Sequence, residues 1–214
     1  MFKKEKKELI KAGIKLDRYG LIALGGGNVS VRMPTGEILM SPSGMIYEEL
    51  VPDDVVVVDI DGNVLEGKRR PSSDIDALLY IFRELPEVNA VIHTHQPLAT
   101  GIGLVCDEFV CNLSTLANAT HGSVTVTPYG PPNSMLMGEY TVKYLNGKLA
   151  VILKHHGVIA VGDSMKQALY ACIYMEEAAK AYIAAKSISD DMAMLTDEEI
   201  ENAVEVFKTY GQKK

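Results

Sequence analysis

Residues 91–97 read Val91-Ile92-His93-Thr94-His95-Gln96-Pro97, and they hold two of the chain's five histidines, one residue apart. The run Asn89-Ala90-Val91-Ile92 that leads into them is largely apolar and β-branched, which predicts a buried strand. Because side chains alternate across a strand, His93 and His95 point to the same face. Two imidazoles on one rigid face are either half of a tetrahedral metal site or a pair of hydrogen-bonded core histidines. This segment alone leaves both interpretations open.

The composition is that of an acidic chain with enough apolar residues for a large core. The 214 residues are 47% hydrophobic, with a formal net charge of −7 and a pI of about 5.3. The length fits one domain over residues 1–214, and the acidic balance argues against nucleic acid as a partner. The three cysteines include no Cys-x-x-Cys pair, which favours a reduced, cytoplasmic protein. We expect no membrane partner, because no signal peptide and no apolar run near ~20 residues is present.

The spacing of apolar residues predicts helices and strands along the whole chain. Apolar residues three and four positions apart predict an amphipathic helix near the start, and Asp61-Gly62 predicts a hairpin. Thr196 followed by Glu199 is a capping box that opens the last helix. We expect helices at 3–19, 75–85, 137–145, 165–187 and 197–210. Besides the strand that carries the first histidine pair, we expect strands at 37–40, 55–60, 64–65, 108–112, 123–127 and 149–153.

Three turns combine glycine or proline with hydroxyl or amide side chains. They are Gly25-Gly26-Gly27-Asn28, Ser41-Pro42-Ser43-Gly44 and Pro71-Ser72-Ser73-Asp74. Each is by itself an ordinary turn, and Ser73 or Asp74 can cap the following helix. Their open amides and hydroxyls also suit an anion such as phosphate. The glycine run lacks the Lys-Ser/Thr ending of a P-loop, which disfavours a nucleoside triphosphate.

A second pair of histidines, His155-His156, precedes Gly157. On an extended chain, adjacent side chains face opposite ways. Only one of the two can therefore join His93 and His95 in a shared site.

Several of these segments follow one another at a characteristic spacing. In this order they resemble the class II sugar-phosphate aldolase and epimerase family over nearly the whole chain, although each match is weak alone. The resemblance implies an α/β fold of three α/β/α layers, in which helices flank a central, mostly antiparallel β-sheet. It also implies a homotetramer with active sites between subunits. The matching segments are Gly27-Asn28-Val29-Ser30-Val31-Arg32, Pro42-Ser43-Gly44, Pro71-Ser72-Ser73-Asp74, Val91-Ile92-His93-Thr94-His95, His155-His156-Gly157 and Phe207-Lys208-Thr209-Tyr210-Gly211.

The resemblance implies a metal centre built from the matching residues. His93, His95 and His156, joined by Asp74, would hold one Zn²⁺ per subunit. Three neutral histidines leave zinc with its full double charge and an open position, where it acts as a Lewis acid. Asp74 would also be the catalytic acid/base.

The remaining matches imply a substrate site. Tyr210 would be a second catalytic residue, and Phe207 would close over the substrate. The substrate phosphate would be held by Gly27, Asn28, Ser43, Gly44, Ser72 and Ser73.

The activity implied is the reversible, zinc-dependent cleavage of L-fuculose 1-phosphate, or a similar ketose 1-phosphate, to dihydroxyacetone phosphate and L-lactaldehyde. Two departures keep L-ribulose-5-phosphate 4-epimerase as an alternative. Asp74 stands where the family's fuculose-phosphate aldolases have Glu and its epimerases have Asp. Residues 112–121 hold neither the catalytic tyrosine of the first nor the aspartate of the second. The tail 207–211 favours the aldolase. Another sugar-phosphate enzyme of the family, such as a dehydratase, and a non-catalytic scaffold module like the adducin head remain as further alternatives.

Overall fold

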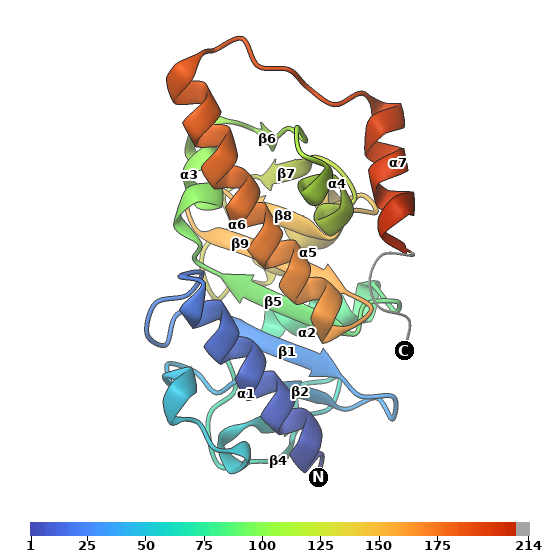
Figure 1. The fold of residues 1–214 in the computed structure, drawn as a ribbon. Helices are drawn as coiled ribbons and strands as arrows, with labels where there is room; N and C mark the ends of the chain where they lie inside the picture. Colours follow the sequence, from blue (N-terminus) through green and yellow to red (C-terminus); the bar gives the residue numbers. More distant parts are fainter. Residues whose placement is uncertain (209–214) are drawn as a thin grey trace.

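The computed structural model describes the backbone of residues 1–208 and the side chains of residues 1–206. Its centre is a sheet of nine strands in the order β4-β3-β2-β1-β5-β9-β8-β7-β6, and Figure 1 shows this sheet running from β4 at the bottom to β6 at the top. The histidine-bearing strand β5 lies in the middle of that order, so it has a neighbour on each side. The strands are β1 (Asn28–Arg32), β2 (Ile38–Met40), β3 (Val56–Val58), β4 (Val64–Glu66), β5 (Ala90–Thr94), β6 (Glu108–Phe109), β7 (Val124–Thr127), β8 (Ala150–Leu153) and β9 (Gly157–Gly162).

The sheet is mixed but mostly antiparallel. Among the described strands, the one parallel pair is β7 with β8, where Val126 pairs with Ile152. A parallel pair needs a crossover connection, and helix α5 (Met135–Leu145) supplies it. The prediction of a mostly antiparallel sheet is therefore confirmed, with this one exception.

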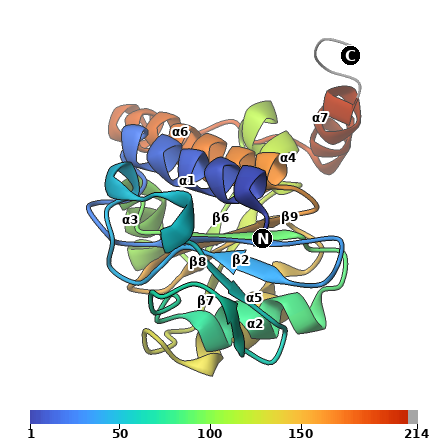
Figure 2. The same cartoon turned by 90° about the horizontal axis from the view of Figure 1, so that it is seen from below.

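Helices contact both faces of the sheet (Figure 2). On one face, α1 (Lys3–Arg18), α3 (Pro97–Val105) and α6 (Met165–Ile188) pack against strands, and α4 (Ser114–Thr120) packs against α6. On the other face lie α2 (Ile75–Glu84) and α5.

Each face has its own apolar core, and the strands contribute to the two cores alternately. Ala90 and Ile92 of β5 belong to the core with α6, whereas Val91 belongs to the core with α2 and α5. The alternation continues along the strand, so His93 lies on the α2 face and Thr94 on the α6 face. The alternation of residues along β5 thus determines that His93 faces the side of the sheet with α2 and that Thr94 faces the side with α6.

The predicted Asp61-Gly62 hairpin and the predicted capping box of the last helix are confirmed, and α6 has a side-chain cap as well. Strand β3 pairs antiparallel with β4 through the Asp61-Gly62 turn. Ser164 accepts a hydrogen bond from the Gln167 amide (3.4 Å) at the start of α6. Thr196 and Glu199 exchange bonds in the capping box that opens α7 (Asp197–Lys208), which packs against α4.

The sequence prediction differs from the structure in two helices and in strands β1, β6 and β9, since no bounds were predicted for β1 or β9. Helices α3 and α4 were not expected, and the strand expected at 108–112 is only the short β6. Over the described residues, no helix is both long and apolar enough to cross a membrane.

Candidate active site

Three histidines from two parts of the sheet meet at one end of β5. His93 is in β5, His95 follows the last residue of that strand, and His156 lies in the turn between β8 and β9. The ring centroids are 4.8 Å apart for His93 and His95, 4.7 Å for His93 and His156, and 5.2 Å for His95 and His156. One ring nitrogen from each lies within 4.8 Å of the others. The structure therefore brings together the three histidines named from the sequence.

The surroundings of His93 fix which of its ring nitrogens is free. Its Nδ1 lies 2.9 Å from the Val158 carbonyl oxygen, which can only accept, so Nδ1 carries the hydrogen. Its Nε2 is therefore unprotonated and carries a free lone pair, and it lies 3.0 Å from Nε2 of His95. Burial lowers the pKa of His93 to about 3, and the nearby His156 and His95 act in the same direction. His93 is thus neutral at physiological pH, the state in which an imidazole binds a metal.

His95 and His156 are less buried than His93 but are also kept neutral. Burial lowers the pKa of both, and the Asp74 charge opposes this shift at each ring. The Asp74 carboxylate thus contributes a negative charge that favours the protonated form of both rings.

His155 faces away from this group. The residue has a left-handed backbone (φ 58°) and an exposed side chain, whose nearest aromatic neighbour is Tyr129 at 6.2 Å. The two adjacent histidines thus diverge in a turn, not on an extended strand as expected. Gly157 allows this turn to sit against β5, since a Cβ there would lie 2.2 Å from the Thr94 carbonyl oxygen.

Asp74 and Asn28 form a buried pair beside the histidines. Asn28 is the cross-strand partner of His93, and residues directly opposite each other in neighbouring strands share a face. The Asn28 side-chain amide donates to Oδ2 of Asp74 at 2.8 Å. Asp74 occupies the N-cap position of α2, yet its side chain makes no capping bond. The expected cap is therefore absent for Asp74, because its carboxylate is turned toward Asn28.

The three turns predicted to bind phosphate lie side by side. Residues 42 and 71 form an antiparallel bridge, and the Ser43 amide donates to the Arg70 carbonyl oxygen at 3.0 Å. Gly27 has a φ of 79°, and a Cβ on it would lie 2.6 Å from the His93 carbonyl oxygen. Only glycine fits there, so the glycine run can approach β5 closely.

A cavity of about 270 Å³ joins these groups. Pro132 and Asn133 also line it, and Asn133 has a left-handed backbone (φ 60°). These two residues were not predicted, and the only signal for them is the run of turn-forming residues from 128 to 134. The Phe207 side chain and all of Tyr210 lie outside the described residues. The sequence-predicted residues that line the cavity are Gly27, Asn28, Ser43, Gly44, Ser72, Ser73, Asp74, His93, His95 and His156.

The geometry fits a metal ion with nitrogen ligands. Two nitrogens on one tetrahedral zinc lie about 3.3 Å apart, given Zn–N bonds of about 2.0–2.1 Å, and the two Nε2 atoms are 3.0 Å apart. In addition, His156 Nδ1 and Asn28 Oδ1 are buried atoms without a hydrogen-bond partner among the described residues. Buried polar atoms in proteins are normally paired, so unpaired ones at one site indicate a missing ligand.

Comparison with known proteins agrees with the geometry. The model of the Class II Aldolase and Adducin N-terminal domain matches residues 7–183. A 5-deoxy-D-ribulose 1-phosphate aldolase of Bacillus thuringiensis serovar kurstaki is 33% identical over 214 residues, 100% of both chains. An L-fuculose phosphate aldolase of Escherichia coli K12 is 32% identical over 205 residues, 96% of this chain and 94% of that one. The solved structure of an L-fuculose 1-phosphate aldolase has a TM-score of 0.89 at 32% identity and covers 95% of each chain. The chain therefore belongs to the class II aldolase and adducin N-terminal domain family, as its motifs predicted, and it is an aldolase.

Proposed function

We propose that the protein is a zinc-dependent aldolase that reversibly cleaves L-fuculose 1-phosphate, or a similar ketose 1-phosphate, to dihydroxyacetone phosphate and L-lactaldehyde. The observation that carries this proposal is the meeting of three neutral histidines, one buried carboxylate and three donor-rich turns around one cavity. A metal, a proton acceptor and an anion site are the three parts that such a cleavage needs.

Zinc would be held by His93, His95 and His156, with Asp74 as a further ligand before substrate binds. In that position zinc supplies a Lewis acid, which stabilises the negative charge that develops on the substrate oxygens. The Val158 carbonyl holds the His93 ring in the tautomer that leaves Nε2 free for the ion.

Asp74 would move the proton at C3 of dihydroxyacetone phosphate. In the condensation direction its carboxylate takes that proton, and the electron pair left at C3 forms the new bond to the aldehyde carbon. In cleavage the same carboxyl group returns the proton to C3 as the C3–C4 bond breaks. The Asn28 amide, 2.8 Å from Oδ2, orients the carboxylate for both directions.

The three turns would bind the substrate phosphate. Backbone amides of Gly27 and Gly44, hydroxyls of Ser43, Ser72 and Ser73, and the side chain of Asn28 would surround the phosphate with donors. Ser72 and Ser73 lie just before Asp74, the N-cap residue of helix α2, and the N-terminus of a helix favours a negative charge. This set carries no positive side chain, so it would bind the dianion by hydrogen bonds alone.

The C-terminal segment would complete the site. Tyr210 would exchange the proton of the C4 oxygen, and Phe207 would close over the substrate. We further propose a homotetramer in the cytoplasm, with active sites between subunits, and the three-layer α/β/α arrangement of the family.

A second substrate is favoured by a specific observation. The relative that is 33% identical over the whole chain is named as a 5-deoxy-D-ribulose 1-phosphate aldolase. Cleavage of that sugar between C3 and C4 also gives dihydroxyacetone phosphate, but with acetaldehyde in place of L-lactaldehyde. The two substrates therefore share the phosphate and metal sites and differ only in the aldehyde part.

Product analysis tests the proposal. The enzyme is incubated separately with L-fuculose 1-phosphate, 5-deoxy-D-ribulose 1-phosphate and L-ribulose 5-phosphate, and both fragments are quantified. We expect dihydroxyacetone phosphate and L-lactaldehyde from the first at the highest kcat/KM. A higher kcat/KM for 5-deoxy-D-ribulose 1-phosphate would mean that the protein is an aldolase of the same mechanism with that sugar as its substrate. Conversion of the third to D-xylulose 5-phosphate without fragments, and no cleavage of the others, would make the protein an epimerase.

A further inference from the structure

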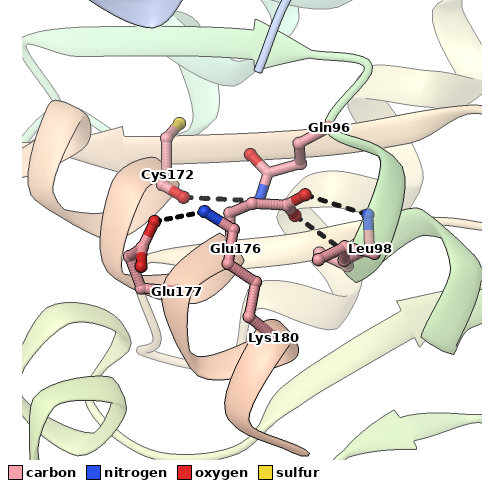
Figure 3. A network of polar contacts seen from close by, with 7 residues as sticks. Gln96, Leu98, Cys172, Glu176, Glu177 and Lys180 are labelled. Carbon is pink, nitrogen blue, oxygen red and sulfur yellow. Dashed lines mark hydrogen bonds and ion pairs between the residues drawn. The ribbon is translucent and has the colours of Figure 1, made fainter. Parts of the chain in front are cut away.

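On the α6 side of the sheet, the stretch that carries His95 is held by a second group of polar contacts, and Figure 3 shows those made by Gln96 and Glu176. Thr94 and Gln96 are completely buried and alternate with His93 and His95. The Thr94 hydroxyl donates to Oε1 of Gln96 at 2.7 Å, and Nε2 of Gln96 donates to the Cys172 carbonyl oxygen at 3.3 Å. The chain is thus tied to helix α6 one residue after His95.

Glu176 of α6 makes the next attachment. Its side chain is 3% exposed. Its Oε1 accepts from the Leu98 amide at 2.9 Å, and its Oε2 accepts from the Ala99 amide at 3.0 Å. These amides belong to the first turn of α3, and Pro97 before them has no amide hydrogen to offer. Gln96 stands at the N-cap without a side-chain capping bond, so Glu176 caps this helix from a distant part of the chain.

The Glu176 carboxylate is held by hydrogen bonds from the start of α3. Within residues 1–206, no basic side chain lies at ion-pair distance from it, and the nearby Lys180 is bonded to Glu177. A buried carboxylate without a cation depends on hydrogen bonds and on the positive end of a helix. Because both carboxylate oxygens are used by two consecutive amides, the start of α3 has one defined position on α6.

We propose that Glu176 is a positioning residue for the metal site, which fixes His95 relative to His93 and His156. Residues 95 and 96 are a short bridge between the end of β5 and the start of α3. Strand pairing holds one end of this bridge, and Glu176 with Gln96 holds the other. Second-sphere groups of this kind orient metal ligands even though they do not touch the ion. This inference rests on the proposed metal-dependent function.

The test compares two adjacent glutamates by their effect on metal affinity. Glu176→Gln keeps the side-chain size but leaves one of the two amides facing an NH₂ group. Glu177→Gln makes the same chemical change one residue further along, at an exposed side chain. The affinity of metal-free protein for Zn²⁺ is measured by competition with a chromophoric chelator, and the site geometry by the absorption spectrum of the Co²⁺-loaded protein. We expect Glu176→Gln to lower the affinity ~10- to 100-fold and to alter the Co²⁺ spectrum. Glu177→Gln should match the wild type.

Glu176→Asp keeps both carboxylate oxygens, but its side chain is one methylene shorter, so the carboxylate lies further from the amides of α3. This variant should give an intermediate loss of Zn²⁺ affinity. It replaces Glu176→Gln if that variant does not fold. Val57→Ala, in the core at β3, serves as a control for lowered stability that does not touch the network. Its melting temperature should fall while its metal affinity stays the same.

The outcomes separate this inference from the proposed function. If the folded Glu176 variants lose melting temperature but bind metal within twofold of the wild type with an unchanged Co²⁺ spectrum, Glu176 is only a helix cap and the inference is wrong. If the wild type itself binds no metal, the proposed metal site fails and this inference with it.

Discussion

Residues 93–96 present two faces whose polar groups are used differently. On the cavity side, His93 and His95 meet His156 and Asn28, and each of these last two has a buried polar atom without a partner among the described residues. On the α6 side, Thr94 and Gln96 are equally buried, yet their side chains bond to one another and to the α6 backbone. The cavity side therefore retains binding capacity that only a ligand can satisfy, whereas the α6 side is closed by the protein itself.

This difference separates the expected effects of mutations on the two sides. A change on the cavity side should alter ligand binding or proton transfer and leave the fold intact, because few protein contacts are lost. A change on the α6 side should alter stability and metal geometry together. The predictions that follow test the cavity side, from the largest expected effect to the smallest.

Replacing Asp74 by Asn should have the largest effect. An amide cannot take a proton, and general acid/base groups contribute ~10²- to 10⁴-fold to rates. We expect Asp74→Asn to slow exchange of the C3 proton of dihydroxyacetone phosphate with solvent D₂O, followed by NMR, by that factor. Zinc content should persist because three histidines remain.

The matched control is Asp76→Asn, an exposed residue two positions along in the same helix. Its exchange rate should equal that of the wild type. Unchanged exchange in Asp74→Asn would remove Asp74 from the proton transfer and would leave the cavity without a described carboxylate for that role.

The second prediction contrasts the two adjacent histidines. His156→Ala should lower zinc affinity ~100-fold or more, since a lost ligand costs at least as much as the ~10- to 100-fold of a lost supporting contact. His155→Ala should bind zinc like the wild type, because its exposed ring points away from the group. Zinc is measured by chelator competition on metal-free protein. The reverse pattern, with loss in His155→Ala alone, would overturn the assignment of the third ligand.

The sequence predicted the cavity side better than the α6 side, for physical reasons. The histidine pair on one face follows from strand alternation, which is a local property of residues 90–95. Helix α6 was predicted, at 165–187, because the spacing of its apolar residues is a local signal too. Even the cap expected from Asp74 failed for a non-local reason, since Asn28 of a different strand binds the carboxylate.

Helix α3 shows what the sequence could not reveal. It begins with Pro97 and contains Gly101 and Gly103, which weaken any helix prediction. Gly103 is needed because a Cβ there would lie 2.5 Å from Ile152 Cγ2, in the neighbouring strand β8. The helix is capped by Glu176, which is 77 residues from Ala99 in the sequence. Packing and capping that come from distant residues leave no periodic pattern to recognise.

The third prediction concerns pH. The unfolded chain protonates a histidine as the pH falls below about 6.5, whereas burial delays protonation of folded His93 to about pH 3. Because the pKa of His93 is lower in the folded state, the unfolded state binds more protons between pH 6.5 and pH 3. The free energy of unfolding of metal-free protein should therefore decrease as the pH falls from 6.5 toward 3. At pH 5 the loss from His93 alone is about 2 kcal/mol.

Urea unfolding of metal-free wild type and His93→Gln at pH 7.5 and pH 5.0 checks this. The wild type should lose about 2 kcal/mol more than the variant between the two pH values. Equal losses would mean that His93 takes up its proton in the folded state as readily as in the unfolded chain.

The smallest effect is expected at the rim of the cavity, at Ser73. Its side chain is exposed, unlike that of Ser72, whose hydroxyl accepts from the Asp74 amide at 3.3 Å. Ser73→Ala therefore leaves no buried group unpaired, and the melting temperature should not change. A hydrogen bond to a charged group contributes about 1.5–3 kcal/mol, and an exposed one lies at the lower end. We expect KM for the phosphorylated sugar to rise roughly tenfold with little change in kcat, because the phosphate is bound alike before and during the reaction. Ser187→Ala, an exposed serine near the end of α6, controls for loss of any surface hydroxyl. If KM stays at the wild-type value in Ser73→Ala, or if wild type turns over the dephosphorylated sugar equally well, these turns bind no phosphate. The cavity side would then be a metal site alone.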